Sequence, residues 1–222
     1  MVLFPTGTVT TTSVGSFGSL WEPNTSADRK VIHTTLVSKT DSNFQVTRKK
    51  ATAYHVFTYK YDGIWAREFL QLERFFKNRD GKLSSFYLVD FSHMQQCSMS
   101  GTDTRTIIKG GSLSTLSTAH FTTTAGDGGN YACVWNPTSA TFKIGVVASI
   151  SADTNITIDN TAGTTVGDLA STTSGIVVAP CYEVFFTDDQ LQFEPGEFNP
   201  NADSDGGFVS SGSISFLQKG VN

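Results

Sequence analysis

One amphipathic helix constrains this chain more than any other feature, because the surrounding sequence has the composition of strands and loops. The segment 65–78 places its large apolar residues on one helical face and its charged residues on the others. That apolar stripe consists of Trp65, Phe69, Leu72, Phe75 and Phe76. The spacing predicts a helix near 64–79, with Asp62 and Gly63 as start signals and Gly81 as a left-handed C-terminal cap. A single helix with an aromatic stripe needs a sheet to pack on.

Strand-like patterns on both sides of this helix supply such a sheet. His55, Phe57 and Tyr59 alternate with more polar neighbours, which predicts a strand with one dry face. The late segment 182–198 alternates in the same way, and 212–220 is expected to form a closing strand that pairs beside an early one. Seventeen phenylalanines in 222 residues suit half-buried pleated surfaces. The sequence therefore predicts a mostly-β fold, an antiparallel β-sandwich flanked by one α-helix.

Composition divides the chain into three parts. Residues 1–27 are rich in Thr, Gly and Ser and are expected to form an extended N-terminal arm. Residues 28–96 and 181–222 carry the strand and helix patterns of the sandwich core. Residues 97–180 are Ser/Thr/Gly-rich with short β-branched runs and many turn signals, which predicts an inserted small β element.

Charge is sparse and unevenly distributed. Charged residues make up 16% of the chain, which indicates either a surface covered by neighbouring subunits or a neutral Ser/Thr/Gly surface. Residues 28–82 hold twelve basic and six acidic residues, whereas residues 83–222 hold four basic and thirteen acidic ones. This asymmetry could steer subunits head to tail, or it could be a solvated charge pattern without a partner. Because 48–50 is the one basic run and the net charge is −4, nucleic-acid binding is not favoured.

Cysteine usage and hydropathy exclude several classes of protein. Cys97, Cys133 and Cys181 are widely spaced and odd in number, so buried reduced thiols are expected instead of a disulfide framework. No apolar run approaches the length of a membrane helix, so no membrane insertion is expected. The N-terminus lacks a basic region followed by an apolar core, so no standard secretion signal is expected.

Catalytic, metal and cofactor patterns are weak, and we expect no enzymatic activity. Carboxylates at positions 183, 188, 189, 194 and 197 could in principle form a hydrolytic pair, but no accompanying histidine or aromatic platform is visible. His93 and Cys97 are four residues apart, and two ligands do not make a zinc site. Asp203 and Asp205 lack the remaining ligands of a calcium loop. Phosphate-binding and dinucleotide-binding fingerprints are missing, so neither a cofactor nor a metal is expected.

Two segments resemble the distal tail proteins of phages. The stretch FLQLERFFKNRDGKLSSFYLVDFSHMQQ is similar to a helix ending in paired aromatics, an Arg/Gly turn and a phenylalanine strand with aspartate. The family's second aspartate would fall near His93, where this chain departs from the pattern. The late CYEVFFTDDQLQF is similar to the closing motif of that family. The matching residues are Phe75, Phe76, Arg79, Gly81, Phe86, Asp90, Asp189, Leu191 and Phe193.

The resemblance implies a virion protein with a tail-tube-like sandwich. Such proteins form homo-hexameric rings that join the tail tube of a long-tailed phage to its baseplate or tip. The implied partners are other copies of the chain, the tail tube protein, baseplate hub or tip proteins, and DNA passing through the lumen. A lumen of this kind favours a neutral or acidic lining, because basic residues would retain phosphates. The implied location is the distal end of the tail, after assembly in the host cytoplasm.

A second interpretation comes from the 97–180 insert. Tyr131 and Trp135 lie in this Ser/Thr/Gly-rich stretch and are typical of an exposed aromatic platform. The alternative function is therefore a carbohydrate-binding or receptor-binding β module, which an insert could also supply while decorating a ring.

Overall fold

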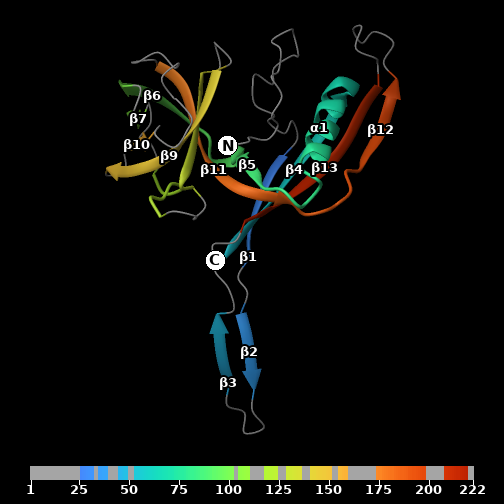
Figure 1. Cartoon of the computed structure of the whole chain (residues 1–222), viewed down its shortest axis with the longest axis horizontal. Helices are drawn as coiled ribbons and strands as arrows, with labels where there is room; N and C mark the ends of the chain where they lie inside the picture. Colours follow the sequence, from blue (N-terminus) through green and yellow to red (C-terminus); the bar gives the residue numbers. More distant parts are fainter. Residues whose placement is uncertain are drawn as a thin grey trace.

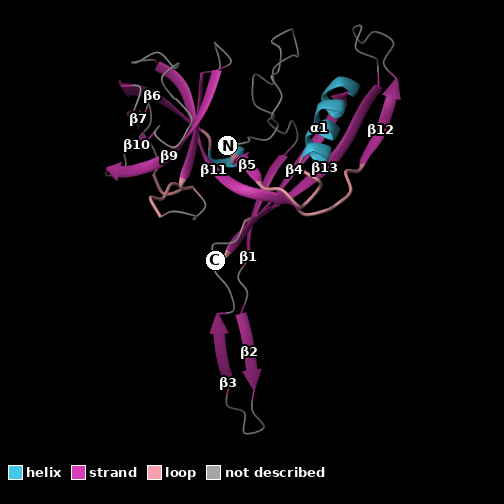
Figure 2. Ribbon diagram, viewed as in Figure 1, coloured by secondary structure: helices cyan, strands magenta, loops and turns pink. Residues whose placement is uncertain are grey.

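The computed structural model describes eleven stretches of the chain. They are residues 26–32, 35–39, 45–49, 53–102, 105–110, 118–124, 129–136, 141–151, 155–159, 174–198 and 208–219. Within them the protein is mostly β, with antiparallel strands and one α-helix, as the sequence predicts. Figure 2 shows this helix against a molecule otherwise built of strands. Most of the expected N-terminal arm, residues 1–25, lies outside the described residues.

The main sheet has the order β1-β4-β13-β11-β5, and β12 pairs with the beginning of β13. The closing strand β13 pairs with the early strand β4, as expected from the sequence. In β4 the alternation of His55, Phe57, Tyr59 and Tyr61 turns every second side chain to the face that carries the core. The bounds are β1 Ser26–Ile32, β4 Tyr54–Trp65, β5 Phe86–Val89, β11 Ser174–Phe186, β12 Phe193–Phe198 and β13 Phe208–Gln218.

The first half of β11 belongs to a second structure, a six-strand barrel. There β11 pairs with β6 on one edge and with β8 on the other, and β7, β10 and β9 complete the circuit. Figure 1 places these strands together at the opposite end of the molecule from the helix. The sequence predicts an inserted small β element in this region, but not its closure into a barrel. The bounds are β6 Gln95–Thr102, β7 Arg105–Gly110, β8 Tyr131–Asn136, β9 Thr141–Ser151 and β10 Asn155–Asp159.

Two strands form a separate arm. Strands β2 (Thr35–Lys39) and β3 (Gln45–Lys49) pair antiparallel in a two-stranded sheet of their own. Figure 1 shows this pair projecting from the body beyond the ends of β1 and β4. The arm therefore extends from the edge of the main sheet.

The helix α1 spans Ala66–Asn78, close to the predicted 64–79. Leu72 and Phe75 of the stripe are buried, and Phe69 and Phe76 are partly buried against the same core. The side chain of Trp65 lies outside the described part of the chain. The aromatic stripe therefore packs on the sheet, as predicted.

The two ends of the helix differ in how well the sequence indicates them. Gly81 is left-handed as predicted, with φ +60, and its N–H donates to the Phe76 carbonyl at 3.2 Å. Asp80 before it is left-handed as well, with φ 52, and it occupies the cap position itself. The start signals are wrong. Asp62 and Gly63 lie within β4, which runs directly into α1, and the Asp62 carboxylate accepts a hydrogen bond from Ser211 at 2.7 Å.

Two clusters of buried side chains stabilise these units. One lies between α1 and the main sheet and is rich in aromatic residues. The other comes from the barrel strands and includes Cys97, Ile156, Ile176 and Val178. The three cysteines are buried free thiols, as expected from the sequence. The division into core and insert stays a prediction, and the first cluster includes Cys133, Ile144 and Ala179 from the predicted insert.

Candidate functional site

Most of the residues that carry the resemblance meet in one joint between α1 and the sheet, whereas Asp90 lies elsewhere. Asp189 approaches the turn after the helix, where its carboxylate accepts the Lys82 backbone N–H at 3.3 Å. The Lys82 ammonium lies 3.0 Å from the same carboxylate. Their hydrogen bond holds the pKa of Asp189 below its ordinary value. Two segments separated by most of the barrel are thus brought into direct contact.

Aromatic residues of the same motifs complete the joint. Phe193 lies 5.3 Å from Phe69 of the helix, between ring centroids. Phe75 and Phe86 meet edge to face at 5.1 Å, and the Arg79 guanidinium lies 5.9 Å from the Phe75 ring centre. Leu191 packs against the same core. The motif residues therefore hold the helix to the sheet, which is a structural role.

Gly81 is closely packed against Asp189 in the joint. A Cβ atom there would lie 2.9 Å from the Asp189 carboxylate oxygen, in a backbone conformation that L side chains rarely adopt. Gly175 has φ +81 but would place a Cβ in open space. Substitutions at the two glycines can therefore distinguish the cost of backbone strain from the cost of the close contact with Asp189.

Gly81→Ala is therefore expected to lower the free energy of unfolding by about 2 kcal/mol, about half of it from backbone strain. Gly175→Ala is the matched control and should cost about 1 kcal/mol, since strain alone acts there. Urea unfolding of the two variants measures the difference. Equal losses would mean that the Asp189 contact does not limit the turn.

Asp90 sits at the other end of the core face. It caps the 3₁₀ helix η1 (Phe91–His93), where its side chain accepts the Ser92 N–H at 3.1 Å. The Arg29 guanidinium lies 3.0 Å from this carboxylate, and His93 Nδ1 lies 2.9 Å from it. Since the Asp90 side chain is 2% exposed, these contacts compensate a buried charge.

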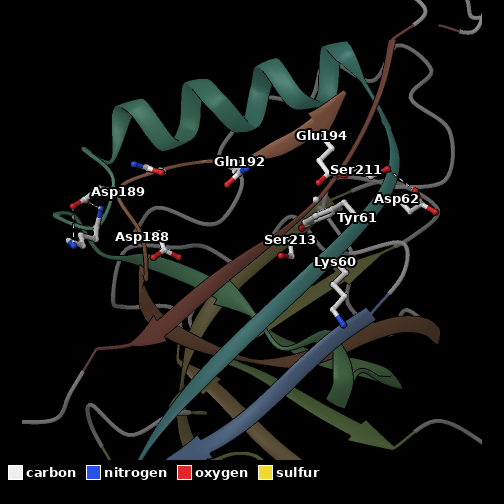
Figure 3. A pocket seen from close by; sticks show the side chains of 12 residues that line it. Lys60, Tyr61, Asp62, Asp188, Asp189, Gln192, Glu194, Ser211 and Ser213 are labelled. Carbon is white, nitrogen blue, oxygen red and sulfur yellow. Dashed lines mark hydrogen bonds and ion pairs between the residues drawn. The ribbon is translucent and has the colours of Figure 1, made fainter. Parts of the chain in front are cut away.

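A polar groove of about 1010 Å³ runs along the sheet beside this joint. Figure 3 shows Lys60, Asp62, Ser213 and Glu194 along strands β4, β13 and β12, with Asp188 and Asp189 at the far end. Lys60 is ion-paired with Asp28 at 3.4 Å. The groove is polar, and carboxylates outnumber lysines in its lining.

The remaining site candidates are dispersed. Glu183 pairs with Lys219 at 2.7 Å, whereas Asp188 accepts from Thr187 at the groove. The side chain of Glu197 and residues 203–205 lie outside the described residues. The Cys97 thiol donates to the Ile176 carbonyl at 3.6 Å, in the barrel core, and burial raises its pKa to about 12. Across the described residues, no group of three or more His, Cys, Asp or Glu side chains could hold a metal ion.

The aromatic pair of the alternative interpretation is not seen as a platform. Tyr131 is partly buried and its ring packs on Tyr87 at 4.7 Å. The side chain of Trp135 lies outside the described residues. Glycan binding by this pair stays a prediction.

No protein-family model matches this chain, and no curated protein matches it. In the described part of the chain, no helix is long and apolar enough to cross a membrane.

Sequence reasoning missed one polar cluster. Arg29, His55, His93, His120 and Gln218 gather around Asp90 at the end of the core face. They come from remote segments, so no local motif marks them. The available signal is His55, a titratable residue on the dry face of a strand.

Proposed function

We propose that this protein is a structural subunit of a long-tailed phage tail, a hexameric ring that joins the tail tube to the baseplate or tip. The observation that carries the proposal is the joint described above. The two segments that resemble distal tail proteins, one around Gly81 and one around Asp189, pack against each other. Two motifs that are far apart in the sequence are thus in contact in the fold, which supports the proposal.

The surface of the main sheet supports the proposal. One face packs on α1, and the other stays partly open over the described residues, with Lys60, Ser213 and Leu217 exposed. The groove on this face carries more carboxylates than lysines. Such a face suits the wall of a lumen through which DNA passes, because it does not retain phosphates.

The edge of the sheet supports it further. Strand β1 is at the end of the strand order, and among the described strands its pairing partner is β4. An edge strand is a template for pairing with another chain. In a closed ring a neighbouring subunit covers this edge, and the arm β2–β3 reaches beyond it.

Light scattering and native mass spectrometry of the purified chain test the proposal, with negative-stain imaging in the presence and absence of tail tube subunits. We expect six copies, or rings formed on the tube. A monomer at high concentration that also fails to bind tube subunits would contradict the proposal.

Val31→Asp sharpens this test. Val31 lies on the edge strand and is 48% exposed, and a carboxylate at this position resists burial against a neighbouring subunit. We expect the dissociation constant of the ring to rise about tenfold or more, equal to about 1.4 kcal/mol. Val31→Thr keeps the branched shape without a charge and should assemble normally. Unchanged assembly of Val31→Asp would place the contact elsewhere.

A further inference from the structure

A histidine cluster lies where the arm leaves the main sheet. Val31 pairs with His55, and Ile32 pairs with Tyr54, at the last register positions of β1 and β4. Beyond these positions the two strands lead to the arm β2–β3. Arg29 and His55 are therefore within a few residues of its root.

Hydrogen bonding fixes the protonation state of His55. Its Nε2 lies 2.7 Å from the Arg29 Nη2, and its Nδ1 lies 2.6 Å from the Gln218 Oε1. A guanidinium has donors and no acceptor, so Nε2 must accept and carry no proton. The proton then sits on Nδ1 and is donated to Gln218, which also accepts the His55 backbone N–H at 3.0 Å. The geometry requires an uncharged imidazole with a single tautomer.

A second proton on His55 breaks this arrangement. Two donors would then face each other at 2.7 Å, and two cations would share one partly buried environment. Burial lowers the pKa of His55 and of His120, so the folded structure resists their protonation. Because Arg29 is in β1 and His55 is in β4, the added proton weakens the contact between these two strands.

The charged and titratable side chains near His55 come from several elements. Asp90 supplies the carboxylate of this cluster, and its Oδ2 lies within hydrogen-bond distance of both Arg29 and His93. The ring of His120 lies 3.7 Å from that of His93, between centroids. Tyr182 of β11 lies below the Arg29 guanidinium at 5.3 Å, and burial raises its pKa to about 12, so it is neutral. Further protons therefore add cations around one carboxylate.

We propose that Arg29, His55 and Asp90 form a proton-sensitive latch at the root of the arm, closed while His55 is neutral. Protonation of His55 separates it from Arg29 and loosens β1 from β4, which frees the root of the arm. The latch depends on contacts within one chain and is independent of the proposed ring.

Linkage gives the direction of the effect. The pKa of His55 is lower in the folded protein than its ordinary value of 6.5. The unfolded chain therefore binds more protons below pH 6.5, and the stability contributed by neutral His55 is present above this pH and lost as the pH falls toward the folded pKa.

Two measurements on the full chain test the latch. Nitrogen-15 NMR at neutral pH reports the tautomer, and we expect Nδ1 to be protonated and Nε2 bare. Amide hydrogen exchange is then followed from pH ~7.5 to pH ~5, with correction for the intrinsic exchange rate. We expect protection of the β1 amides to fall by up to about tenfold for each unit by which the pKa is lowered, while α1 and β8 keep theirs.

Three variants isolate His55. His55→Gln supplies a non-titrating acceptor to Arg29 and should remove the pH response of β1. His120→Gln is the matched control, since it removes a titrating ring without touching Arg29, and should keep the response. Gln218→Glu stabilises the imidazolium and should move the transition to higher pH.

Several results would overturn the latch. They are a proton on Nε2 at neutral pH, unchanged β1 protection at low pH, and a wild-type response that persists in His55→Gln. Loss of protection in β1, α1 and β8 together would also overturn it, because that pattern indicates global unfolding.

Discussion

Phe186→Ala is expected to lower the free energy of unfolding by about 3–5 kcal/mol, the largest loss anticipated for a single side chain here. Phe186 is 3% exposed and joins the helix to the sheet. Its ring centroid lies 4.8 Å from those of Phe76 and Phe86 and 5.6 Å from that of Phe216. Alanine would remove all three contacts and leave a cavity between rigid neighbours.

Urea unfolding monitored by circular dichroism measures this loss. Leu83→Ala is the control, since Leu83 is 75% exposed and its truncation should change stability by less than about 0.5 kcal/mol. Phe76→Ala provides a graded comparison, because Phe76 is partly buried and should cost less than Phe186→Ala. A loss below about 1 kcal/mol for Phe186→Ala would mean that α1 is not held by this cluster.

Local patterns predicted the helix and the left-handed turn that ends it well. The apolar stripe repeats with helical periodicity, and Gly81 follows it where a left-handed residue is needed. Both signals act within a few residues, so they survive without knowledge of the rest of the fold. The start of α1 is harder to predict, because Asp62 and Gly63 lie within β4 at an irregularity of its pairing with β13, where Ser211 donates to the Asp62 carboxylate.

The barrel could not be predicted, because it depends on pairing between distant segments and not on local signals. Its closure depends on β11, which pairs with two strands on opposite edges in its first half and with two others in its second half. The sequence of β11 shows a long alternating apolar run, and Ile176 and Tyr182 look equivalent in it. They enter different core clusters. Pairing between distant segments is not written in local periodicity.

The cluster around Asp90 was partly predictable, less so than the helix and more so than the barrel. The resemblance pointed to Asp90, but not to its partners Arg29 and His93. His55 carried a usable signal, because a titratable side chain on the dry face of a strand needs a buried hydrogen-bond partner. Identifying Arg29 and Gln218 as the partners required the register of β1 and β13 against β4.

Arg29→Met is expected to cost about 3 kcal/mol in the free energy of unfolding at neutral pH. The Arg29 side chain is 19% exposed and lies 3.0 Å from the Asp90 carboxylate, whose side chain is 2% exposed. Methionine keeps much of the length and packing but leaves this carboxylate with Ser92 and His93 as partners. The cost arises mainly from a buried charge that has lost its cation.

The double variant Arg29→Met/Asp90→Asn distinguishes charge from packing. Asparagine retains an oxygen that can accept the Ser92 N–H and so cap η1, while the uncompensated charge is gone. Unfolding measurements on the wild type, both single variants and the double variant form a double-mutant cycle. If the loss reflects the unpaired carboxylate, the double variant is more stable than Arg29→Met. If it is less stable, Arg29 contributes through its packing on Tyr182, and the ion pair is secondary.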